Sequence, residues 1–414
     1  MSHRMAMNST EAAVIGAGPA GLVTALALAR SGIEVALVAP PYDAARTAAD
    51  RRTTALMGPS VELLKNLDVW GACAGEAAAI AAVRIADDRD GVIRAPEVLF
   101  RASELGLESF GANIANPVLL AALHAAADRT PRLTRVATAG VRHIEPGAAG
   151  VRLELAEGGA ITAALTVAAD GRSSIAPAAA GIGVRTWDYP QVAIVTSFGH
   201  SRPHAGIVNE LHRHAGPLTT VPLPGRRSSL VWAEEPGEAQ RIAGLDDGEF
   251  AAVLEERLQG LLGTVSGVEP RGLYPLKGQR AERMAGARIA LVGEAAHVIP
   301  PIGAQGLNLG LRDAAALAEC AAEAHARGED IGGPAVLAAY EGARSADVFA
   351  RSVSIDLLNR SLLTDLLAVD ALRGLAAHLL ASFGPLRRLL MQGGMGSTGP
   401  LPRLMRPNAP SPGP

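Results

Sequence analysis

The sequence predicts an α/β fold in which a Rossmann-like nucleotide-binding domain is interrupted by an antiparallel-sheet domain and followed by C-terminal helices. Three observations predict it. The chain opens on a strand–helix–strand pattern, its middle holds short apolar runs separated by Pro and Gly, and its end has long helical patterns.

The opening pattern is expected to be a β-α-β unit. Glu11–Gly16 is predicted to be a buried strand, Pro19–Ser31 an amphipathic helix closed by Gly32, and Glu34–Val38 a second strand. Such a unit fits within about 30 residues. Further helices are expected at residues 59–67 and 117–127, and a further strand at 165–169.

The pattern changes after residue 183. Apolar runs at 192–197, 218–222 and 229–233 are broken by Pro and Gly, which favours an antiparallel sheet over more helix–strand alternation. The chain then returns to a buried strand, and long helices follow. That strand is expected at 288–293 and the helices at 305–325, 336–352 and 356–391.

Composition excludes several classes of function. The chain has 414 residues and a net charge of −3, which does not suggest a nucleic-acid partner. Its two cysteines, Cys73 and Cys320, form neither a disulfide framework nor a metal cluster, so we expect no metal site. No apolar run reaches the roughly 18 residues of a membrane span, and the N-terminus lacks the apolar core of a signal peptide. A soluble cytoplasmic protein is therefore expected.

A glycine-rich turn follows the first strand. Gly16 permits a tight strand-to-helix turn, Gly18 lets the backbone approach a pyrophosphate, and Gly21, after Ala20, permits close helix packing. Phosphates bind at such helix N-termini because free N–H groups and the helix dipole favour negative charge. The acid that usually follows the second strand and holds a ribose is absent, since Ala39 stands there.

Two later segments complete a cofactor constellation. Asp170-Gly171 ends a strand, and Gly293-Glu294 ends another, where a carboxylate is expected to contact ribityl hydroxyls. A rigid loop and a helix N-terminus follow, placed to stabilise an anionic reduced flavin. The three segments together predict FAD. The cofactor residues expected in the last segment are Pro301, Gly303, Ala304, Gln305, Gly306, Leu307 and Asn308.

These motifs resemble the class A flavoprotein monooxygenases, the family of para-hydroxybenzoate hydroxylase, and within it the ubiquinone-biosynthesis hydroxylases. The stretch Gly293–Asn308 is similar to the second FAD motif of the family, with Glu294 in place of the usual Asp. The resemblance runs from about residue 11 to 396. It is carried also by residues 50–56 and 67–70, Tyr189, Gln191, His204, Glu210, residues 216–217, 222–223 and 231–232, Tyr340, Arg344 and Asp356.

The resemblance implies an oxygen-using enzyme. NAD(P)H reduces FAD, O₂ adds as a flavin C4a-hydroperoxide, and one oxygen passes to an aromatic ring, here a prenylated phenol of ubiquinone biosynthesis. By family position Arg52 contacts the FAD phosphate, Gln305 the flavin ring, and Pro301 shapes the substrate side. Asp170-Gly171 is implied to serve both FAD and NAD(P)H. The catalytic base stays unassigned, with His204, His212 and Tyr189 as candidates.

The expected domains follow from the same pattern. Residues 1–75, 105–182 and 280–335 are expected to form a discontinuous FAD-binding domain, and 76–104 with 183–279 a substrate-binding sheet domain. C-terminal helices are expected at 336–396 and a flexible tail at 397–414. Leu362–Met391 either packs on the FAD domain or contacts the inner membrane or a biosynthetic complex.

Departures from the family keep alternatives open. Ala39, Asn116-Pro117, Ala176 and Leu211-His212 differ from its usual residues. Of these, Ala39, Pro117 and Ala176 favour a non-catalytic flavoprotein scaffold as one alternative. A flavin-dependent prenyl reductase is another. The sequence does not indicate which ring carbon is hydroxylated, the identity of the electron donor or the oligomeric state.

Overall fold

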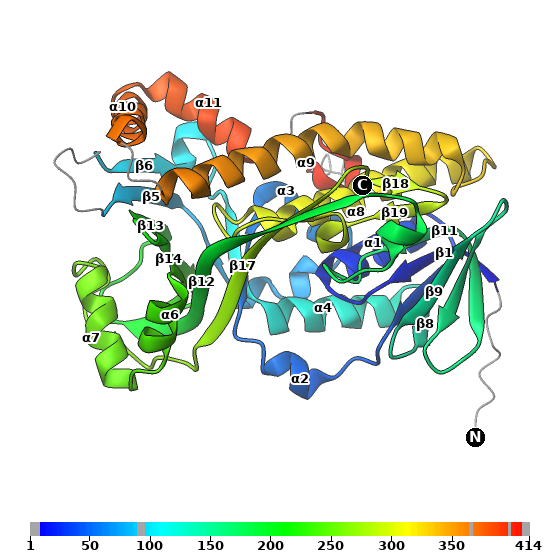
Figure 1. Cartoon of the computed structure of the whole chain (residues 1–414), viewed down its shortest axis with the longest axis horizontal. Coiled ribbons are helices and arrows are strands. Elements are labelled where there is room, and N and C mark those ends of the chain that lie inside the picture. The colour runs from blue at the N-terminus through cyan, green and yellow to red at the C-terminus, as the bar shows by residue number, and fades with distance from the viewer. Residues whose placement is uncertain (1–8, 89–95, 364–366, 396–398, 408–414) are drawn as a thin grey trace, which may run out of the picture.

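The computed structural model describes residues 9–88, 96–363, 367–395 and 399–407 (Figure 1). One of its three sheets is a mainly parallel sheet with the strand order β18-β19-β11-β1-β2-β8, to which β10 and β9 add as an antiparallel extension of β11. Its strands are β1 Ser9–Ile15, β2 Val35–Ala39, β8 Leu133–Ala137, β9 Val141–Pro146, β10 Val151–Leu155, β11 Ala160–Ala168, β18 Ala285–Gly286 and β19 Ile289–Leu291.

Helices pack on this sheet because their apolar faces need burial. In α1 (Pro19–Arg30) every residue from Gly21 to Ala29 is buried, so the helix is buried on all sides and the predicted amphipathic pattern is wrong. It contacts α4 (Asn116–Arg129) and α8 (Gln305–Ala326). The remaining helices of this region are α2 Ala44–Ala48, α3 Gly58–Asn66 and α5 Ala176–Ala179, with 3₁₀ turns η1 Trp70–Ala72, η2 Ala74–Glu76, η3 Ala102–Leu105 and η4 Gly293–Ala295.

A second large sheet has the order β20-β17-β12-β15-β14-β13-β5-β6, with β16 beside β12. The predicted antiparallel pairing is present except between β13 and β5, which are parallel. Two helices that the sequence analysis did not anticipate, α6 Pro236–Ala243 and α7 Asp247–Arg257, pack on it and bury Phe250 and Leu254. Its strands are β5 Ala82–Asp87, β6 Val98–Arg101, β12 Val184–His200, β13 Ile207–Arg213, β14 Gly216–Leu223, β15 Arg227–Glu234, β16 Val265–Ser266, β17 Gly272–Ala281 and β20 His297–Val298.

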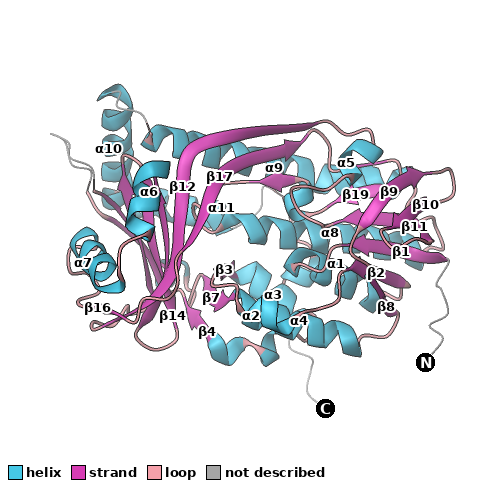
Figure 2. Ribbon diagram, turned by 60° about the horizontal axis from the view of Figure 1, so that its bottom comes forward, coloured by secondary structure: helices cyan, strands magenta, loops and turns pink. Residues whose placement is uncertain are grey.

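A small third sheet lies between the two large ones (Figure 2). It has the order β3-β7-β4, from Thr53–Met57, Gly111–Ala115 and Ala77–Ala79. Gly111 has a φ of 153°, and a Cβ there would lie 1.9 Å from the carbonyl oxygen of Leu56. This close approach explains why the strand begins with glycine.

The C-terminal region corrects one expectation. Helix α9 runs unbroken over Pro334–Leu362, so the predicted break between residues 352 and 356 is wrong. It spans the molecule from the parallel sheet to the second large sheet (Figure 1). The helices α10 Leu367–Ser382 and α11 Gly384–Met395 follow it.

Part of the expected flexible tail is packed. The turn η5 (Arg403–Met405) lies on α3 and α8, and Met405 is buried. Asn66 donates to the carbonyl oxygen of Leu404 at 2.8 Å. Residues 397–398 and 408–414 of that expected tail lie outside the described residues.

Candidate cofactor site and active site

Three segments that are far apart in the sequence leave the parallel sheet at the same edge. β1, β11 and β19 are parallel neighbours, with Ile15 opposite Ala168 and Ala168 opposite Leu291. In open α/β sheets, ligands bind at the carboxyl ends of the strands. The fold therefore brings together the three segments that the sequence analysis singled out for FAD.

In the glycine turn between β1 and α1, Gly16 and Gly21 have no room for a side chain, whereas Gly18 has room for one. A Cβ on Gly16 would lie 2.4 Å from the carbonyl oxygen of Ala169, and a Cβ on Gly21 would lie 2.1 Å from that of Gly16. A Cβ on Gly18, by contrast, has nothing within 4 Å. Gly18 is the N-cap of α1, whose N-terminus carries no side-chain cap. Open space before an uncapped helix N-terminus fits a phosphate group.

Small residues bring α8 against the same turn. Gly293 has a φ of 62°, and a Cβ on Gly310 would lie 3.0 Å from its Cα. A Cβ on Gly293 would lie 3.3 Å from the Cβ of Ala20. The predicted cofactor residues Ala20 and Gly293 thus contact each other, and their small size lets α1 and α8 pack closely at the strand ends.

Charged side chains surround this edge. Arg52 forms a two-point ion pair with Asp50, with Nε and Nη2 at 2.9 and 2.8 Å from its carboxylate oxygens, and its guanidinium lies over the ring of Tyr274. The hydrogen bond to Asp50 raises the pKa of Arg52, and the negative charge of Glu294 adds to this shift. Arg52 and Glu294, predicted from segments far apart in the sequence, therefore interact electrostatically.

Asp170 keeps an exposed surface, although protein atoms crowd its carboxylate. The resulting loss of hydration raises its pKa, and a hydrogen bond from Ser174 opposes this shift. Its neighbour Gly171 has a φ of 87°, a left-handed conformation that favours glycine. Glu294 is exposed as well. Both predicted acids are therefore accessible to a ligand from solvent.

A buried carboxylate supports the turn after β19. The Oδ2 atom of Asp313, in α8, accepts from the backbone N–H of Gly293 at 3.1 Å and lies 2.6 Å from Nε2 of His297. Its Oδ1 accepts from Nε of Arg344 at 2.7 Å. Burial alone would raise the pKa of Asp313, but interactions with His297 and Arg344 outweigh it and lower the pKa. His297 is thus a packed, hydrogen-bonded residue.

The ion pairs continue from this carboxylate to the start of α8. Arg344 and Arg312 both donate to Oδ2 of Asp347, at 2.9 and 2.7 Å. Arg351 donates from Nε to Oδ1 of Asp347 at 3.0 Å and from Nη1 to Oε1 of Gln305 at 2.6 Å. Gln305, predicted to contact the flavin ring, is therefore held by an arginine of α9.

The start of α8 has an unusual backbone. Gly303 and Ala304 have φ values of 63° and 55°, and the left-handed conformation costs an alanine roughly 1 kcal/mol. Asn308 connects this turn to β3, since its amide donates to the carbonyl oxygens of Ala304 and Ala55 and its Oδ1 accepts from the N–H of Met57. Asn308 thus positions the loop by contacts with the backbone.

The other residues of this loop differ in exposure. Pro301 and Gly306 are exposed, and Leu307 is half-buried and packs on the core. A Cβ on Gly303 or Gly306 would meet nothing within 4 Å. The predicted flavin-facing loop is therefore open to solvent along much of its length.

The departures from the family have local explanations. Asp43, the acid nearest to Ala39, accepts from the N–H of Arg46 and caps α2, which occupies its carboxylate. Asn116 accepts from the hydroxyl of Thr54 at 2.6 Å. Ala176 is fully buried in the core at the start of α5, where an arginine side chain would have no room to extend without moving its neighbours.

The three candidates for activating a phenol all have structural contacts. His204 accepts at Nδ1 from the N–H of Gly206 and donates from Nε2 to the carbonyl oxygen of Leu223. The hydroxyl of Tyr189 donates to Asp356 of α9 at 2.6 Å. The third candidate, His212, lies 2.8 Å from Glu210. No catalytic base is assigned.

Polar side chains connect the small sheet to the second large sheet. The hydroxyl of Thr53, in β3, donates to that of Ser229, in β15, at 2.8 Å. Asn113, in β7, donates to the carbonyl oxygen of Pro222 at 2.9 Å. Thr53 directly follows Arg52 in the chain, and Asn113 stands three residues before Asn116. The two hydrogen bonds therefore fix the second large sheet relative to the candidate cofactor site.

The chain matches a family model described as an FAD binding domain over residues 9–352. It belongs to this family of FAD-binding proteins. The chain is 37% identical over 398 residues to the ubiquinone hydroxylase UbiL of Rhodospirillum rubrum, and the alignment covers 95% of this chain and 92% of that protein. It is 30% identical over 398 residues to the 3-demethoxyubiquinol 3-hydroxylase of Escherichia coli, and the alignment covers 95% of this chain and 100% of that protein.

A solved structure supports the fold. The p-nitrophenol 4-monooxygenase PnpA from Pseudomonas putida superposes with a TM-score of 0.75 at 19% identity, covering 95% of this chain and 100% of that one. The predicted fold class and the predicted membership of the FAD-dependent monooxygenases, near the ubiquinone hydroxylases, are confirmed. The protein is an FAD-dependent aromatic-ring hydroxylase.

The residues at the sheet edge fit FAD. The open position at Gly18 before an uncapped helix suits the pyrophosphate, and the exposed Glu294 suits hydroxyl groups. Bound FAD supplies the electron transfer and the activation of oxygen, and the protein supplies orientation and electrostatics. Sequence reasoning missed Asp313 and Arg351, whose role depends on contacts between separate elements.

Proposed function

We propose that the enzyme hydroxylates the aromatic ring of a prenylated phenol in ubiquinone biosynthesis, with NAD(P)H as electron donor. The observation that carries the proposal is the meeting of three FAD segments at one sheet edge, beside a second large sheet. The relatives named as ubiquinone hydroxylases, which align with nearly the whole chain, support the substrate class.

The overall reaction is balanced in atoms and electrons. The phenol, O₂, NAD(P)H and one proton give the hydroxylated ring, water and NAD(P)⁺. Reduction of dioxygen to one hydroxyl group and one water takes two electrons from NAD(P)H and two from the ring C–H bond. A prenylated substrate needs a largely apolar pocket with few polar groups to orient its ring.

The residues of the chain have distinct tasks in this proposal. Gly18 and Arg52 bind the diphosphate, and Glu294 binds hydroxyl groups of the cofactor. Asn308 and the left-handed turn before it hold the start of α8, whose N–H groups stabilise negative charge on the bound ring. The contact of Thr53 with Ser229 keeps the second large sheet closed over this edge and limits the entry of water.

A turnover assay tests the proposal. Purified holoenzyme is mixed with NADPH or NADH and a short-chain prenylated phenol under labelled dioxygen. We expect pyridine nucleotide oxidation, oxygen uptake and one labelled oxygen atom in the product. Substrate reduction without oxygen uptake would indicate a prenyl reductase instead. Flavin that binds tightly but never turns over with either nucleotide would favour a scaffold.

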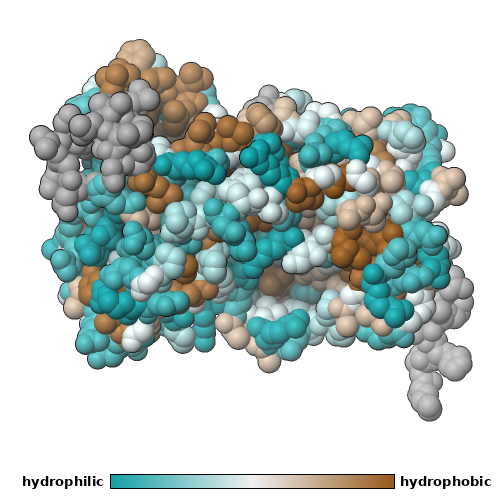
Figure 3. All heavy atoms as spheres, viewed as in Figure 1, coloured by the Kyte–Doolittle hydropathy of each residue, from teal (hydrophilic) through white to brown (hydrophobic). Residues whose placement is uncertain are grey.

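We also propose that the enzyme contacts a membrane surface through its C-terminal helices. Exposed apolar side chains gather there, at the top left of Figure 3. The described residues 374–393 contain no acidic side chain, and Arg388 among them is exposed. Apolar and basic groups on surface helices favour an anionic lipid surface. The exposed apolar residues are Leu357, Leu375, Leu379, Phe383, Leu389 and Leu390.

The described helices include none long and apolar enough to cross a membrane. Peripheral contact is therefore tested by flotation with vesicles of phosphatidylcholine and phosphatidylglycerol. We expect the wild type to float with the vesicles. The double variant with Leu379→Glu and Phe383→Glu should remain at the bottom of the gradient. Ile175→Glu, at an exposed apolar residue beside α5, is the control. Equal flotation of all three proteins would contradict the proposal.

A further inference from the structure

The end of β2 lacks the acid that normally binds a ribose. Ala39 is only 7% exposed, and its carbonyl oxygen accepts from the N–H of Thr138 at 3.1 Å. Pro40 and Pro41 follow and have no N–H to offer. Asp43 caps α2. The adenosine half of FAD therefore needs contacts from another element.

A cavity of about 260 Å³ lies at this point, between the ends of β2 and β8 and helix α4. It is several times larger than the roughly 30 Å³ of a water molecule in the liquid. The N–H of Gly16 donates to the carbonyl oxygen of Val38, which stands in the chain between the lining residues Leu37 and Ala39. Its walls include Leu37, Pro41, Tyr42, Asp128, Arg135 and Val136.

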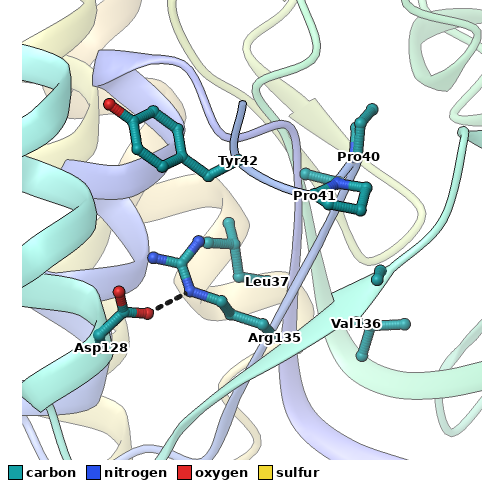
Figure 4. A pocket seen from close by; sticks show the side chains of 9 residues that line it. Leu37, Pro40, Pro41, Tyr42, Asp128, Arg135 and Val136 are labelled. Carbon is teal, nitrogen blue, oxygen red and sulfur yellow. Dashed lines mark hydrogen bonds and ion pairs between the residues drawn. The ribbon is translucent and has the colours of Figure 1, made fainter. Parts of the chain in front are cut away.

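A fixed arginine lies in this cavity. Arg135, opposite Leu37 in the β2–β8 pair, donates from Nε to Asp128 at 2.6 Å and from Nη2 to the carbonyl oxygen of His124 at 3.0 Å. Its Nη1 lies 3.0 Å from Nδ1 of His124. Figure 4 shows the guanidinium between Asp128 and Leu37, below Tyr42. Three contacts hold the guanidinium in one orientation, and its side chain remains 27% exposed.

An aromatic side chain forms the rim of the cavity. The ring of Tyr42 stacks on that of His124 at a centroid distance of 4.0 Å and an angle of 29°. Burial, and then the charge of Arg135, lower the pKa of His124 to about 4, so the imidazole is neutral and accepts a hydrogen bond at Nδ1. Tyr42 itself is 38% exposed. Its ring is therefore held in place beside the guanidinium and open to a ligand.

We propose that Arg135 and Tyr42 bind the adenosine of FAD in place of the missing acid. The guanidinium donates to ribose hydroxyl oxygens, which accept hydrogen bonds as readily as they donate them to a carboxylate. Apolar Leu37, Pro41 and Val136 give the adenine an apolar wall, and the ring of Tyr42 closes one side. The proposal rests on FAD binding at the glycine turn and concerns the far end of the same cofactor.

Titration of the apoprotein with FAD, and separately with ADP as a probe of the adenosine half, tests this proposal. Loss of a hydrogen bond from a charged donor weakens binding about tenfold to a hundredfold. We expect Arg135→Gln to weaken both FAD and ADP by that factor, and Tyr42→Leu to weaken both several-fold. Arg132→Gln changes the arginine directly before β8, which pairs with Glu34 on the surface, and it should leave both affinities unchanged.

The outcomes separate this proposal from its premise. A wild type that binds no FAD would refute the cofactor site itself. A wild type that binds FAD, with folded Arg135→Gln and Tyr42→Leu variants of unchanged affinity for FAD and ADP, would overturn the assignment of the adenosine contacts. If Arg135→Gln does not fold, Tyr42→Leu alone decides, because its exposed ring is not part of the core. Thermal unfolding of each apoprotein identifies the folded variants.

Discussion

Gly16, Gly18 and Gly21 occupy one turn, but the structure requires each of them for a different reason. Gly16 has a φ of 102° and no room for a Cβ beside Ala169, and Gly21 has no room beside Gly16. Gly18 has neither constraint, since its φ is −72° and its Cβ position is open. The packing around Gly18 does not require a glycine beyond its preference at the N-cap, so we assign this position to the approach of a ligand.

This difference gives a prediction at Gly18. Gly18→Val is expected to keep the free energy of unfolding of the apoprotein within about 1 kcal/mol of wild type, since only an N-cap preference changes. Its affinity for FAD should fall by a hundredfold or more, roughly 2.7 kcal/mol. Denaturant unfolding and flavin fluorescence titration measure the two quantities. Gly21→Ala, as the matched control, should instead destabilise the fold. Full flavin retention by Gly18→Val would refute the phosphate assignment.

His124 makes stability depend on pH. Its pKa is about 4 in the folded protein and 6.5 as the unperturbed value, so the unfolded chain binds more protons between these limits. The contribution of the neutral imidazole to the free energy of unfolding is complete above pH 6.5, and it is lost as the pH falls toward 4. We expect a loss of about 2 kcal/mol between about pH 7 and about pH 5.

The expected slope is measured by urea unfolding at several pH values. His124→Asn keeps an acceptor for Arg135 and cannot titrate, so this contribution should disappear. His143→Asn, at an exposed histidine of β9, is the control and should retain the wild-type slope. A wild-type slope in His124→Asn would show that another group is responsible.

At the scale of elements, α9 connects the two halves of the molecule by polar contacts. Its N-terminal half carries Arg344 and Asp347 in the buried ion-pair network. Further along, Asp356 accepts from Tyr189 of β12, and the amide of Asn359 donates to Gln191. A single rigid helix thus fixes the second large sheet relative to the parallel sheet.

Two glycines in long helices should respond oppositely to alanine. Gly342 lies in the exposed interior of α9 with nothing near its Cβ position, so Gly342→Ala should raise the free energy of unfolding by about 0.5–1 kcal/mol. Gly310 in α8 faces Gly293, and Gly310→Ala should destabilise the protein by about 1–3 kcal/mol because α1 and α8 cannot approach. Denaturant unfolding of both variants measures this. Equal effects would contradict the close-packing argument.

Elements with strong local signals were predictable from the sequence. Helices α1 and α8 begin at the predicted residues, Pro19 and Gln305. The break in α9 was predicted wrongly because Ser352, at the edge of the predicted break, looks like a solvent-facing residue in sequence but is buried within the helix. Helix α7 was missed although its capping box, Asp246 with Glu249, is a readable signal.

At the scale of the whole molecule, the sequence predicted the segments that meet at the edge of the parallel sheet. It did not predict the ion pairs and hydrogen bonds that hold these segments in place. The glycines and Glu294 follow from local motifs at strand ends. The pairing of Asp313 with Arg344, and of Gln305 with Arg351, depends on where α9 crosses α8, which no local pattern reveals. The cavity beside Ala39, which we propose to hold adenosine, was missed for the same reason, because Arg135 lies on a strand far in sequence from Ala39.

Arg351 is where the parts of the molecule meet. It binds Asp347 of α9, Gln305 at the start of α8 and, from Nη2 at 3.4 Å, the carbonyl oxygen of Gly393 in α11. If the C-terminal helices contact a membrane, this side chain links that surface to the flavin loop by direct hydrogen bonds. Asp347 keeps Arg312 and Arg344 when Arg351 is replaced, so its charge stays paired.

Arg351→Met should therefore fold and loosen Gln305. We expect FAD affinity to fall about tenfold, which corresponds to the lower end of the energy range for a hydrogen bond from a charged group. The flavin absorbance spectrum should also shift, because the start of α8 relaxes. Arg360→Met is the matched control, since Arg360 lies on the same helix and pairs with Asp356 at an exposed site. If Arg351→Met and Arg360→Met have the same FAD affinity and the same flavin spectrum, the contacts of Arg351 with Asp347 and Gln305 stabilise the fold without positioning the flavin loop. A difference confined to Arg351→Met would establish that α9 positions the flavin loop.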